Sequence, residues 1–598
     1  MAVTDIALVV ITPAGLETAH GLRSVLPGAR IHGLAGRVEG DESFTDAMAH
    51  LRALFVAGTS IVGVCAAGIL IRAVAPLLAD KRAEPPVLAV AVDGSSVVPL
   101  LGGHRGANAL AQRVAQALGV APALTTAGEL ALGLALDDPP PGWRIANPAA
   151  AKSVAAALLA EEPVSLEVET GDSGWLDGLV FTGEAGHAIR ITDRAVTPDD
   201  HELVFHPPVL TLGVGCERHA APDELIGLVR ATLAAEALSP LAVACVASID
   251  LKADEAAVHA LAAELGVPAR FFTAAELERE ADRLATPSDV VFAETGCHGV
   301  AEGAALAAAD PRADLIVPKV KSARATCAVA RSPVAIDPLA AGRPRGRLFV
   351  VGIGPGTPEW RSPEAAAAIA ASTDLVGYGL YLDLLDAATL GKARHESALG
   401  AEETRARKAL DLAAEGRTVS LVCSGDPGIY ALATLVFELM DREKRPDWNR
   451  LDITVVPGIS ALQAAAARSG APVNHDFCTI SLSDLLTPWE SIEARLKAAA
   501  AADFVVCFYN PVSNRRRDQL PRARDILLTG RPPETPVILA RQLGRPGETV
   551  EVIALSELSA DKVDMLTMVV VGSSETRSFT AGERTWTYTP RGYGKKMG

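Results

Sequence analysis

Three glycine-rich turns that follow apolar runs carry the clearest chemical pattern in this sequence. The first, RLFVVGIGPGTPE, places Gly352, Gly354 and Gly356 around Pro355 at the end of an expected strand. Ligands bind at the carboxyl edge of open parallel sheets, where glycine lets the backbone approach them closely. The third glycine comes one residue too early for the GxGxxG fingerprint of dinucleotide sites. The motif therefore predicts a small-ligand site and disfavours a nicotinamide cofactor.

Two further turns of the same kind follow, in VSLVCSGDPGIYALA (419–433) and ITVVPGISALQAAAARSGAP (453–472). Each reads as an apolar strand, a tight turn with an exposed acid or hydroxyl, and an Ala-rich helix. Asp426 stands out because a carboxylate at a strand end can accept hydrogen bonds from a ligand or stabilise a cationic centre. The alternative is that Asp426 caps its own turn.

The elements around these motifs alternate along the whole chain. Apolar β-branched runs precede Gly-containing turns and Ala-rich helices, as in DIALVVITPAG, in LTLGVGC followed by DELIGLVRATLAAEAL, and in RLFVVGIGPG followed by SPEAAAAIAAS. This alternation predicts multidomain α/β architecture with largely parallel sheets. Pro- and Gly-rich breaks divide the chain into segments. The predicted segments are 1–138, 139–208, 209–332, a linker 333–345, and 346–598.

Length and composition set the broad class. The chain has 598 residues, enough for about four domains of roughly 150 residues each. Its 55 Lys and Arg against 72 Asp and Glu give a net charge of −17, which argues against nucleic acid as a partner. Eight cysteines occur without a CxxC pair or zinc-ligand spacing. They predict buried free thiols, a cytoplasmic location and no bound metal.

One uncharged stretch resembles a membrane segment at first sight. No charged residue occurs between Ala53 and Ile71, but the run contains Gly, Thr and Ser and is only modestly hydrophobic. We expect a buried strand and loop there, and no membrane partner. The N-terminus lacks a basic region and a small-residue cleavage pattern, so no signal peptide is predicted.

The motifs GIGPG, SGDPGIY, VPGISA and FYNPVS, in this order, resemble those of the S-adenosylmethionine-dependent tetrapyrrole methyltransferases. Within them, GAPVNHDFCTISLSDLLTPWE (470–490) followed by FYNPVSNRR is similar to the precorrin-3B C-17 methyltransferases of cobalamin biosynthesis. The resemblance implies two α/β lobes, about 346–456 and 457–598, in a homodimer. It implies S-adenosyl-L-methionine as cofactor and a small-molecule precorrin as substrate, which is methylated at C-17 as its ring contracts.

The same resemblance implies roles for individual residues. Ring contraction needs a base, for which His475 beside Asp476 is the candidate, with Ser481, Ser483 and Asp484 as polar partners. The alternative is that His475 is a structural residue of a turn. Arg515 and Arg516, with Arg517, could bind the acetate and propionate groups of the substrate, although a solvated helix face is the alternative. The donor contacts would be Pro355, Ser424, Gly425, Asp426, Ile429, Ser460, Ala461, Tyr509 and Asn510.

The N-terminal half resembles the cobalt-precorrin-5A hydrolase family in GILIRAVAPLLADKR (68–82), PLLGGHRGANALA (99–111), ASIDLKADE (247–255) and VPKVKSARATCAVA (317–330). The resemblance implies opening of a macrocycle lactone with release of acetaldehyde. This step needs an activated water and stabilisation of negative charge. His104 could supply the base, although GGH also fits a tight turn. Asn108 could orient or donate, and Lys319 and Lys321 could stabilise an oxyanion or bind substrate carboxylates. Glu294 and Glu302 are further candidate acids, or else complement helix dipoles.

Two questions stay open at the level of sequence. This chain reads HRGAN with one Gly before AN, where some family members have two, so the N-terminal half could bind a tetrapyrrole without hydrolysing it. The macrocycle could be metal-free precorrin-3B or its cobalt-containing counterpart; the alternative is that the C-terminal half acts on another tetrapyrrole. Other cobalamin-pathway enzymes could act as partners.

Overall fold

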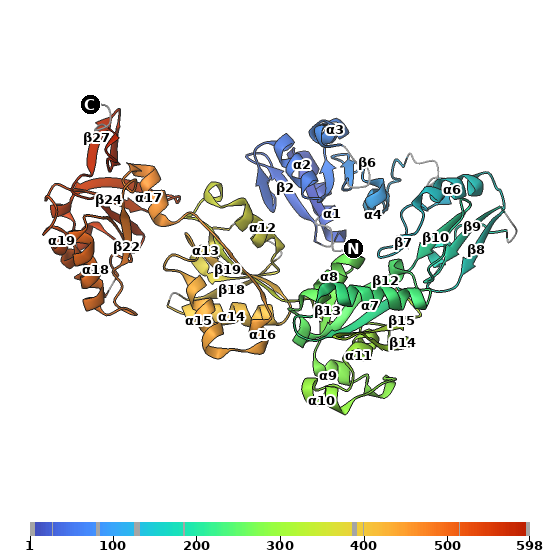
Figure 1. The fold of residues 1–598 in the computed structure, drawn as a ribbon. Helices are drawn as coiled ribbons and strands as arrows, with labels where there is room; N and C mark the ends of the chain where they lie inside the picture. The colour runs from blue at the N-terminus through green and yellow to red at the C-terminus, as the bar shows by residue number, and fades with distance from the viewer. Residues whose placement is uncertain are drawn as a thin grey trace. The chain divides into compact units, whose positions relative to one another are not determined.

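The computed structural model describes residues 6–26, 28–78, 84–124, 132–182, 186–385, 392–398, 400–513 and 515–593. They form two compact units, Met1–Arg345 and Gly346–Gly598. Strands alternate with helices in both units, which confirms the predicted multidomain α/β class (Figure 1). The second unit starts where the last predicted segment starts, and the finer division of the first unit stays a prediction.

The first sheet has the strand order β3-β2-β1-β4-β5-β6, and all its neighbouring pairs are parallel except β5 and β6. Its strands are Ile6–Val10 (β1), Arg30–Leu34 (β2), Glu42–Phe44 (β3), Ser60–Val64 (β4), Val87–Val90 (β5) and Val97–Leu101 (β6). Its helices are Leu16–Val25 (α1), Ala47–Val56 (α2), Ala67–Val74 (α3) and Ala107–Leu118 (α4).

The uncharged stretch from Ala53 to Ile71 forms the end of α2, all of β4 and the start of α3. The five residues of β4 are buried and are flanked by the non-helical residues 57–59 and 65–66, so the predicted buried strand and loop are confirmed between the two helices. In the part of the chain that the structure describes, no helix is long and apolar enough to cross a membrane.

Two further sheets complete the first unit, with the orders β7-β10-β9-β8 and β13-β12-β11-β15-β14. The first contains Arg144–Ile145 (β7), Val164–Val168 (β8), His187–Ile191 (β9), Glu202–His206 (β10) and the helix Ala151–Leu159 (α6). The strands of the second are Leu210–Cys216 (β11), Val243–Ile249 (β12), Ala269–Phe272 (β13), Asp314–Lys321 (β14) and Ala325–Arg331 (β15). Its helices are Pro222–Ala235 (α7), Ala256–Leu265 (α8), Ala274–Glu278 (α9), Asp289–Thr295 (α10) and Val300–Ala307 (α11).

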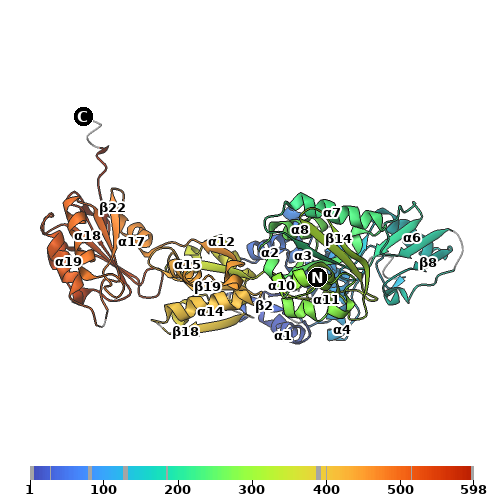
Figure 2. The same cartoon turned by 60° about the horizontal axis from the view of Figure 1, so that its bottom comes forward.

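The second unit opens with a five-stranded sheet of order β18-β17-β19-β16-β20, in which every neighbouring pair is parallel. Its strands are Arg347–Gly352 (β16), Asp374–Tyr378 (β17), Ala393–Ser397 (β18), Thr418–Cys423 (β19) and Asp452–Val456 (β20). Its helices are Pro363–Ala371 (α12), Gly379–Asp383 (α13), Glu402–Ala414 (α14), Leu432–Glu443 (α15) and Pro446–Asn449 (α16). Helices α14, α15 and α16 cover one face and α12 and α13 the other (Figures 1 and 2).

The rest of the second unit forms a five-stranded sheet of order β22-β23-β26-β24-β25 and a small sheet of order β21-β28-β27. Only the β22–β23 pair is parallel in the larger sheet, which corrects the expectation of largely parallel strands there. A short β24–β25 connection leaves no room for a crossover helix, so these strands must be antiparallel. The strands are Gly470–Ala471 (β21), Phe477–Ser481 (β22), Val505–Tyr509 (β23), Pro536–Arg541 (β24), Thr549–Ala554 (β25), Thr567–Val571 (β26), Arg577–Ala581 (β27) and Arg584–Tyr588 (β28). The helices are Ala461–Ser469 (α17), Trp489–Ala501 (α18) and Gln519–Leu527 (α19).

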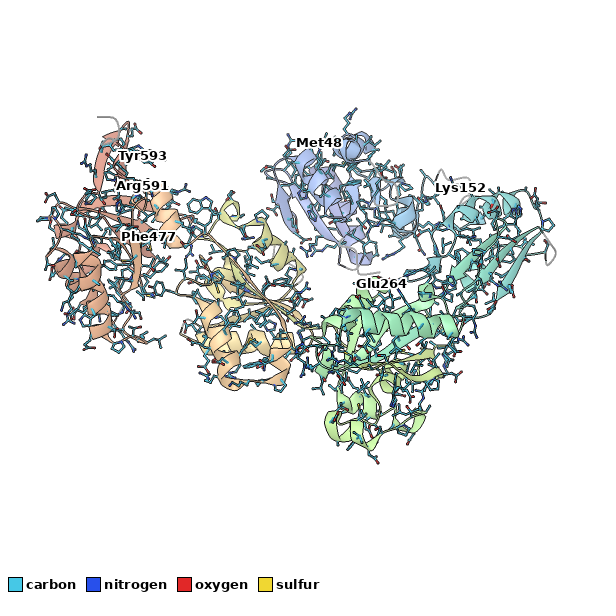
Figure 3. All side chains as sticks on the ribbon, viewed as in Figure 1. Met48, Lys152, Glu264, Phe477, Arg591 and Tyr593 are labelled. Carbon is cyan, nitrogen blue, oxygen red and sulfur yellow. The ribbon has the colours of Figure 1, made fainter. Side chains whose placement is uncertain are left out.

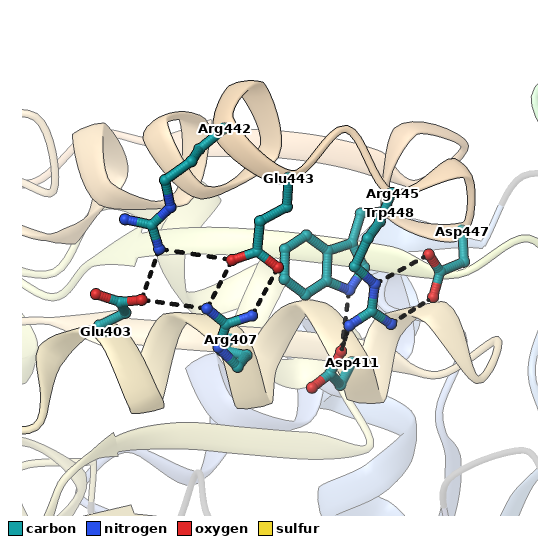
Figure 4. A network of polar contacts seen from close by, with 8 residues as sticks. All are labelled: Glu403, Arg407, Asp411, Arg442, Glu443, Arg445, Asp447 and Trp448. Carbon is teal, nitrogen blue, oxygen red and sulfur yellow. Dashed lines mark hydrogen bonds and ion pairs between the residues drawn. The ribbon is translucent and has the colours of Figure 1, made fainter.

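A polar network fastens α14 to α15 and α16 (Figure 4). Arg407 on α14 donates to both carboxylate oxygens of Glu443 on α15, at 2.8 and 2.6 Å. The fully buried Trp448 of α16 donates from Nε1 to Asp411, and the Arg445 guanidinium lies 4.2 Å from its ring centroid. Bidentate Arg–carboxylate pairs fix geometry well. The network therefore holds α15, whose first residues reach the cavity described below.

The cysteines agree with the sequence-based expectation. All eight are free thiols, six of them buried and two, Cys216 and Cys478, half-buried.

Candidate active site

The three predicted turns meet at one edge of the parallel sheet. Strand β16 lies between β19 and β20, with Gly352 paired to Cys423 and Val351 to Val456. Because the three strands run in the same direction and in register, the segments that follow them emerge side by side. The local sequence thus brings together the motifs 352–356, 424–430 and 457–460.

Backbone hydrogen bonds join the first two turns. The Gly354 amide donates to the Gly425 carbonyl at 3.2 Å, and the Gly425 amide donates to the Gly354 carbonyl at 2.8 Å. Both residues have positive φ, +73° and +70°. Glycine adopts this region without the steric cost that a Cβ imposes. The glycines at these positions are therefore required by the backbone itself.

A cavity of about 310 Å³ lies at this edge. All nine residues that the sequence analysis named as donor contacts line it. They are Pro355, Ser424, Gly425, Asp426, Ile429, Ser460, Ala461, Tyr509 and Asn510. The structure therefore brings together residues spread over more than 150 positions of the chain, and their binding roles are taken up below as a proposal.

Asp426 lines the cavity and also accepts two backbone hydrogen bonds. One carboxylate oxygen accepts from the Gly428 amide at 2.8 Å, the hydrogen bond of an Asx turn, and the other accepts from the Gly458 amide at 3.1 Å. Asp426 therefore caps its own turn, as the alternative made from the sequence predicted, and ties the second turn to the third; its contact with a ligand stays a prediction. Its negative charge faces a cavity that a cationic ligand could enter.

Two helices begin at the cavity wall. The buried Ser460 caps α17 by accepting from the Gln463 amide, and Gln463 accepts in return from the Ser460 amide, a capping box. Helix α15 starts at Leu432 without a side-chain cap, and Ala431 and Leu432 line the cavity. The first amides of this helix have partners of their own, since the Ala433 amide donates to the Pro427 carbonyl at 3.0 Å and the Leu432 amide donates to the Cys423 thiol.

Tyr509 offers a buried polar group to the cavity. Its hydroxyl makes no hydrogen bond of normal geometry with the described residues. Burial raises the pKa of Tyr509, although the nearby Ser460 hydroxyl and Leu462 amide favour its ionised form. The hydroxyl therefore stays protonated at neutral pH. A buried donor without a partner is costly unless a ligand satisfies it.

Three residues with left-handed backbone also line the cavity. Tyr430, Asn510 and Gln542 have φ of 52°, 50° and 51°. Such conformations are unfavourable for residues with a side chain and concentrate at functional sites. The Tyr430 hydroxyl donates to the Thr479 carbonyl at 3.0 Å, and its ring centroid lies 5.0 Å from that of Tyr509. The sequence analysis missed Tyr430 and Gln542.

Comparison with known proteins shows the family of the region that forms this cavity. Residues 347–559 match the model of the tetrapyrrole (corrin/porphyrin) methylases. Over 249 residues the chain is 44% identical to the precorrin-3B C(17)-methyltransferase of a Sinorhizobium species, covering 42% of this chain and 97% of that protein. The chain belongs to the tetrapyrrole methylase family. This confirms the resemblance stated from the motifs.

Further comparisons concern both halves. The chain is 43% identical over 252 residues to cobalamin biosynthesis protein CobIJ of Mycobacterium bovis, covering 42% of this chain and 48% of that protein, so it spans about half the length of this relative. A crystal structure of the methyltransferase CobJ is 42% identical and covers 41% of this chain and 100% of that chain, with a TM-score of 0.39. Residues 49–129 match the "Cobalamin synthesis G N-terminal" model and 210–330 the "Cobalamin synthesis G C-terminus" model. The predicted fusion to a second cobalamin-pathway module is thereby confirmed.

The tetrapyrrole methylase cavity does not include the His475–Asp476 pair. Both side chains are exposed and precede β22, whereas Tyr509 and Asn510 lie at the carboxyl end of the parallel strand β23. The five residues of β22, at roughly 3.3 Å each, separate the pair from that end. Phe477, labelled in Figure 3, follows the pair. Its side chain is 46% exposed. The structure gives this predicted base no contact with the cavity, and its catalytic role stays a prediction.

The arginine run of the methylase region also lies outside the cavity lining. Arg516 donates to the carbonyls of Leu482 and Asn510 at 2.7 and 2.8 Å, so it supports the loop that carries Asn510. Arg515 is exposed, and Arg517 pairs with Asp561 at 2.7 Å. Among the predicted polar partners, Ser481 accepts from the Asn510 amide nitrogen, the Ser483 amide donates to Ser481, and Asp484 accepts from Gln519.

In the N-terminal half, Lys319, Lys321 and Glu294 line a second cavity of about 710 Å³. It lies beyond the carboxyl ends of β11 and β12, and Lys252, Arg218 and Arg324 also line it. The Lys321 side chain is exposed, and its ammonium group makes no ion pair or hydrogen bond with the described residues. The sequence analysis missed the three other cations because they come from separate strand ends.

Two other predicted residues of this half have different outcomes. Glu302 is 2% exposed and accepts from the amide and hydroxyl of Thr286 and from the Lys319 amide. Burial alone would raise the pKa of Glu302, but these hydrogen bonds lower it. Glu302 therefore holds a loop in place. The His104 side chain lies outside the described part of the chain, and Asn108 stands in the first turn of α4.

Proposed function

We propose that residues 346–598 transfer a methyl group from S-adenosyl-L-methionine to C-17 of precorrin-3B, or of its cobalt-containing counterpart, with contraction of the ring. The observation that carries the proposal is the convergence of all nine motif-derived residues on one cavity. The name of the Sinorhizobium relative supports the same reaction. We further propose that the chain acts in the cytoplasm as a homodimer.

The residues of the cavity fit the methyl donor. A volume of about 310 Å³ lies at the lower end of the range for small-molecule sites. The Tyr509 hydroxyl offers a hydrogen-bond donor, and Asp426 offers a negative charge. Ser424, Asp426 and Tyr509 would hold the donor. When bound, S-adenosylmethionine supplies an electrophilic methyl group that passes to a ring carbon.

The protein's part in methyl transfer is alignment. The glycine turns form a backbone wall at the strand edge, and the Asp426 hydrogen bonds keep the second and third turns in fixed relation. Fixed relative placement of two reactants supplies much of the rate enhancement in such reactions. Burial raises the pKa of the cavity-lining Cys423 to about 11. Its thiol stays protonated at neutral pH and does not compete as a nucleophile.

The function is tested by mass spectrometry. Full-length protein would be incubated with S-adenosylmethionine and either precorrin-3B or its cobalt-containing counterpart. Gain of one methyl group on either macrocycle supports the proposal and identifies the substrate form. Asp426→Ala should lose most of this activity, whereas Glu438→Gln, an exposed change on α15, should keep it. Absence of methylation of both macrocycles contradicts the proposal.

A second function is favoured by the cavity of the N-terminal half. We propose that this cavity binds the carboxylates of a tetrapyrrole, because Lys252, Lys319 and Lys321 line it together. Lysine is a point charge suited to carboxylate groups. Binding could serve lactone hydrolysis or delivery alone. Acetaldehyde release from a cobalt-precorrin-5A substrate supports hydrolysis, and binding without release supports delivery. No binding, or binding unaffected by Lys321→Gln, contradicts the assignment.

A further inference from the structure

Arg545 is a cation of the methylase cavity whose charge no residue of the described chain balances. It follows β24 and lines the cavity. Its Nε donates to the Pro355 carbonyl at 2.8 Å and its Nη2 to the Ser424 hydroxyl at 3.1 Å. Both partners are neutral. By contrast, Arg407, Arg442 and Arg445 of the same unit all pair with carboxylates (Figure 4).

The environment of Arg545 is unfavourable for an unpaired charge. Burial lowers the pKa of its guanidinium, and in the described chain only Tyr381 acts in the opposite direction. Arginine nevertheless remains charged at neutral pH. Burying a charge without a counter-charge is costly, so buried charged groups are usually paired with a group of opposite charge.

The Arg545 guanidinium also has N–H groups that are not used in its two hydrogen bonds. Of its five N–H groups, two are used in the hydrogen bonds to Pro355 and Ser424. Nη1 makes no hydrogen bond with the described residues, and Nη2 keeps a second hydrogen. The Nη1 and Nη2 nitrogens form the edge that binds a carboxylate with two parallel hydrogen bonds.

Close packing fixes the position of Arg545. A Cβ placed on Gly356 would lie 2.6 Å from the Arg545 Cγ and 2.5 Å from the Gly544 carbonyl oxygen. The absence of a side chain at Gly356 is therefore what admits Arg545 beside the first turn. A residue held this way, with its charge uncompensated, is preorganised for an anionic ligand.

We propose that Arg545 is the carboxylate-binding residue of the cavity, pairing through its guanidinium with a carboxylate of the bound ligand. This rests on the proposed methyl transfer. Two ligands of that reaction carry carboxylates: the amino-acid end of S-adenosylmethionine and the acetate or propionate groups of the macrocycle. A guanidinium repels the donor's sulfonium and attracts a carboxylate, so Arg545 also selects the orientation of what binds.

The test compares ligands that differ by a carboxylate. Affinities for S-adenosylhomocysteine and for its decarboxylated analogue would be measured by calorimetry on full-length wild type, Arg545→Met and Arg545→Lys. The control is Arg541→Met, since Arg541 pairs with Asp564 and does not line the cavity. The KM for the macrocycle would be measured on the same proteins.

If Arg545 binds the donor, Arg545→Met lowers the affinity for S-adenosylhomocysteine by roughly tenfold to hundredfold. The affinity for the decarboxylated analogue stays unchanged. If it binds the macrocycle, both donor ligands bind normally and the KM for the macrocycle rises by a similar factor. In either case Arg545→Lys recovers part of the loss. Either result supports the proposal.

An equal loss of affinity for both donor ligands would show that Arg545 only holds the two turns together, and would overturn the proposal. Unchanged affinities and KM would also overturn it. Failure of the wild-type protein to bind either donor ligand would instead contradict the proposed methyl transfer, and this assignment with it.

Discussion

Gly458 approaches Gly425 so closely that a Cβ on Gly458 would overlap the carbonyl oxygen of Gly425. That same oxygen accepts the Gly354 amide, and the Gly458 amide donates to Asp426. The three turns therefore meet through backbone atoms at one point. Their spacing in the sequence reflects this packing as much as any contact with a ligand.

Gly458→Ala should separate the second and third turns. Forcing a methyl group into a closely packed site costs about 1–3 kcal/mol, and the strain here falls on the cavity wall. We expect the affinity for S-adenosylhomocysteine to fall by at least about tenfold. The control is Gly428→Ala in the second turn, where a Cβ would meet only the Asp426 carboxylate at 3.3 Å. Equal affinities of the two variants would refute this account of the turns.

Trp448→Ala should destabilise the second unit. The indole is fully buried beneath Arg445 and donates to Asp411. Removing a buried tryptophan costs about 3–5 kcal/mol, so the urea midpoint of this unit should fall clearly. Trp586→Ala, at a half-buried position on β28, should cost much less. The two variants can be compared by tryptophan fluorescence and circular dichroism during urea unfolding; equal midpoints would contradict the prediction.

The α14–α15 network should weaken in acid. The Arg407 hydrogen bonds lower the pKa of Glu443, and those of Arg442 lower the pKa of Glu403. A carboxyl group whose pKa is lower in the folded state stabilises the fold above its unfolded pKa, near 4.5. That stabilisation is lost as pH falls through the folded pKa.

Thermal unfolding between pH 7 and pH 3 tests whether the network loses its stabilising effect in acid. Glu443→Gln should show a smaller drop in melting temperature on acidification than the wild type, because it lacks one of the titrating groups. Glu438→Gln changes an exposed residue of the same helix that forms no ion pair with the described residues, and should follow the wild type. A Glu443→Gln curve parallel to that of the wild type would count against the network.

Cys423 should resist alkylation in the native protein. Burial raises its pKa to about 11, so at pH 8 only a very small fraction is thiolate, the form that reacts. Peptide mass mapping after iodoacetamide treatment should find Cys423 unmodified in native protein and modified in urea. Rapid native labelling would show that the thiol is accessible and ionised, against the structure.

His475→Ala should leave donor binding unchanged. The side chain is exposed, lies at the amino end of β22 and contacts the Asp476 amide. We expect S-adenosylhomocysteine affinity within about twofold of the wild type, the range usual for surface changes. A large loss would place His475 at the cavity in the ligand-bound protein and restore the sequence-based assignment.

The difference between Asp426 and Arg545 shows what the sequence could predict. Asp426 sits in a turn directly after a strand, and local pattern alone places it at the sheet edge that binds ligands. Arg545 lies 190 positions from Pro355 in a segment without a recognisable motif. Its contact with the first turn depends on how two sheets pack, which no local pattern encodes.

The position of His475 outside the cavity lining has a related cause. The sequence NHDFC predicts a turn before a strand, but it does not say which end of the strand faces the cavity. The parallel pairing of β22 with β23 decides this, and it puts Ser481 rather than His475 at the same end as Asn510. Three cations of the N-terminal cavity were missed for the same reason, since Arg218, Lys252 and Arg324 follow three different strands.

The proposed methyl transfer to C-17 is tested by locating the transferred methyl group in the product. Full-length protein would be incubated with S-adenosylmethionine carrying carbon-13 in its methyl group and with precorrin-3B or its cobalt-containing counterpart, and the product examined by NMR. We expect one enriched methyl group, attached at C-17 of a ring-contracted macrocycle. Enrichment at another carbon, or a macrocycle without label, would contradict the proposed transfer.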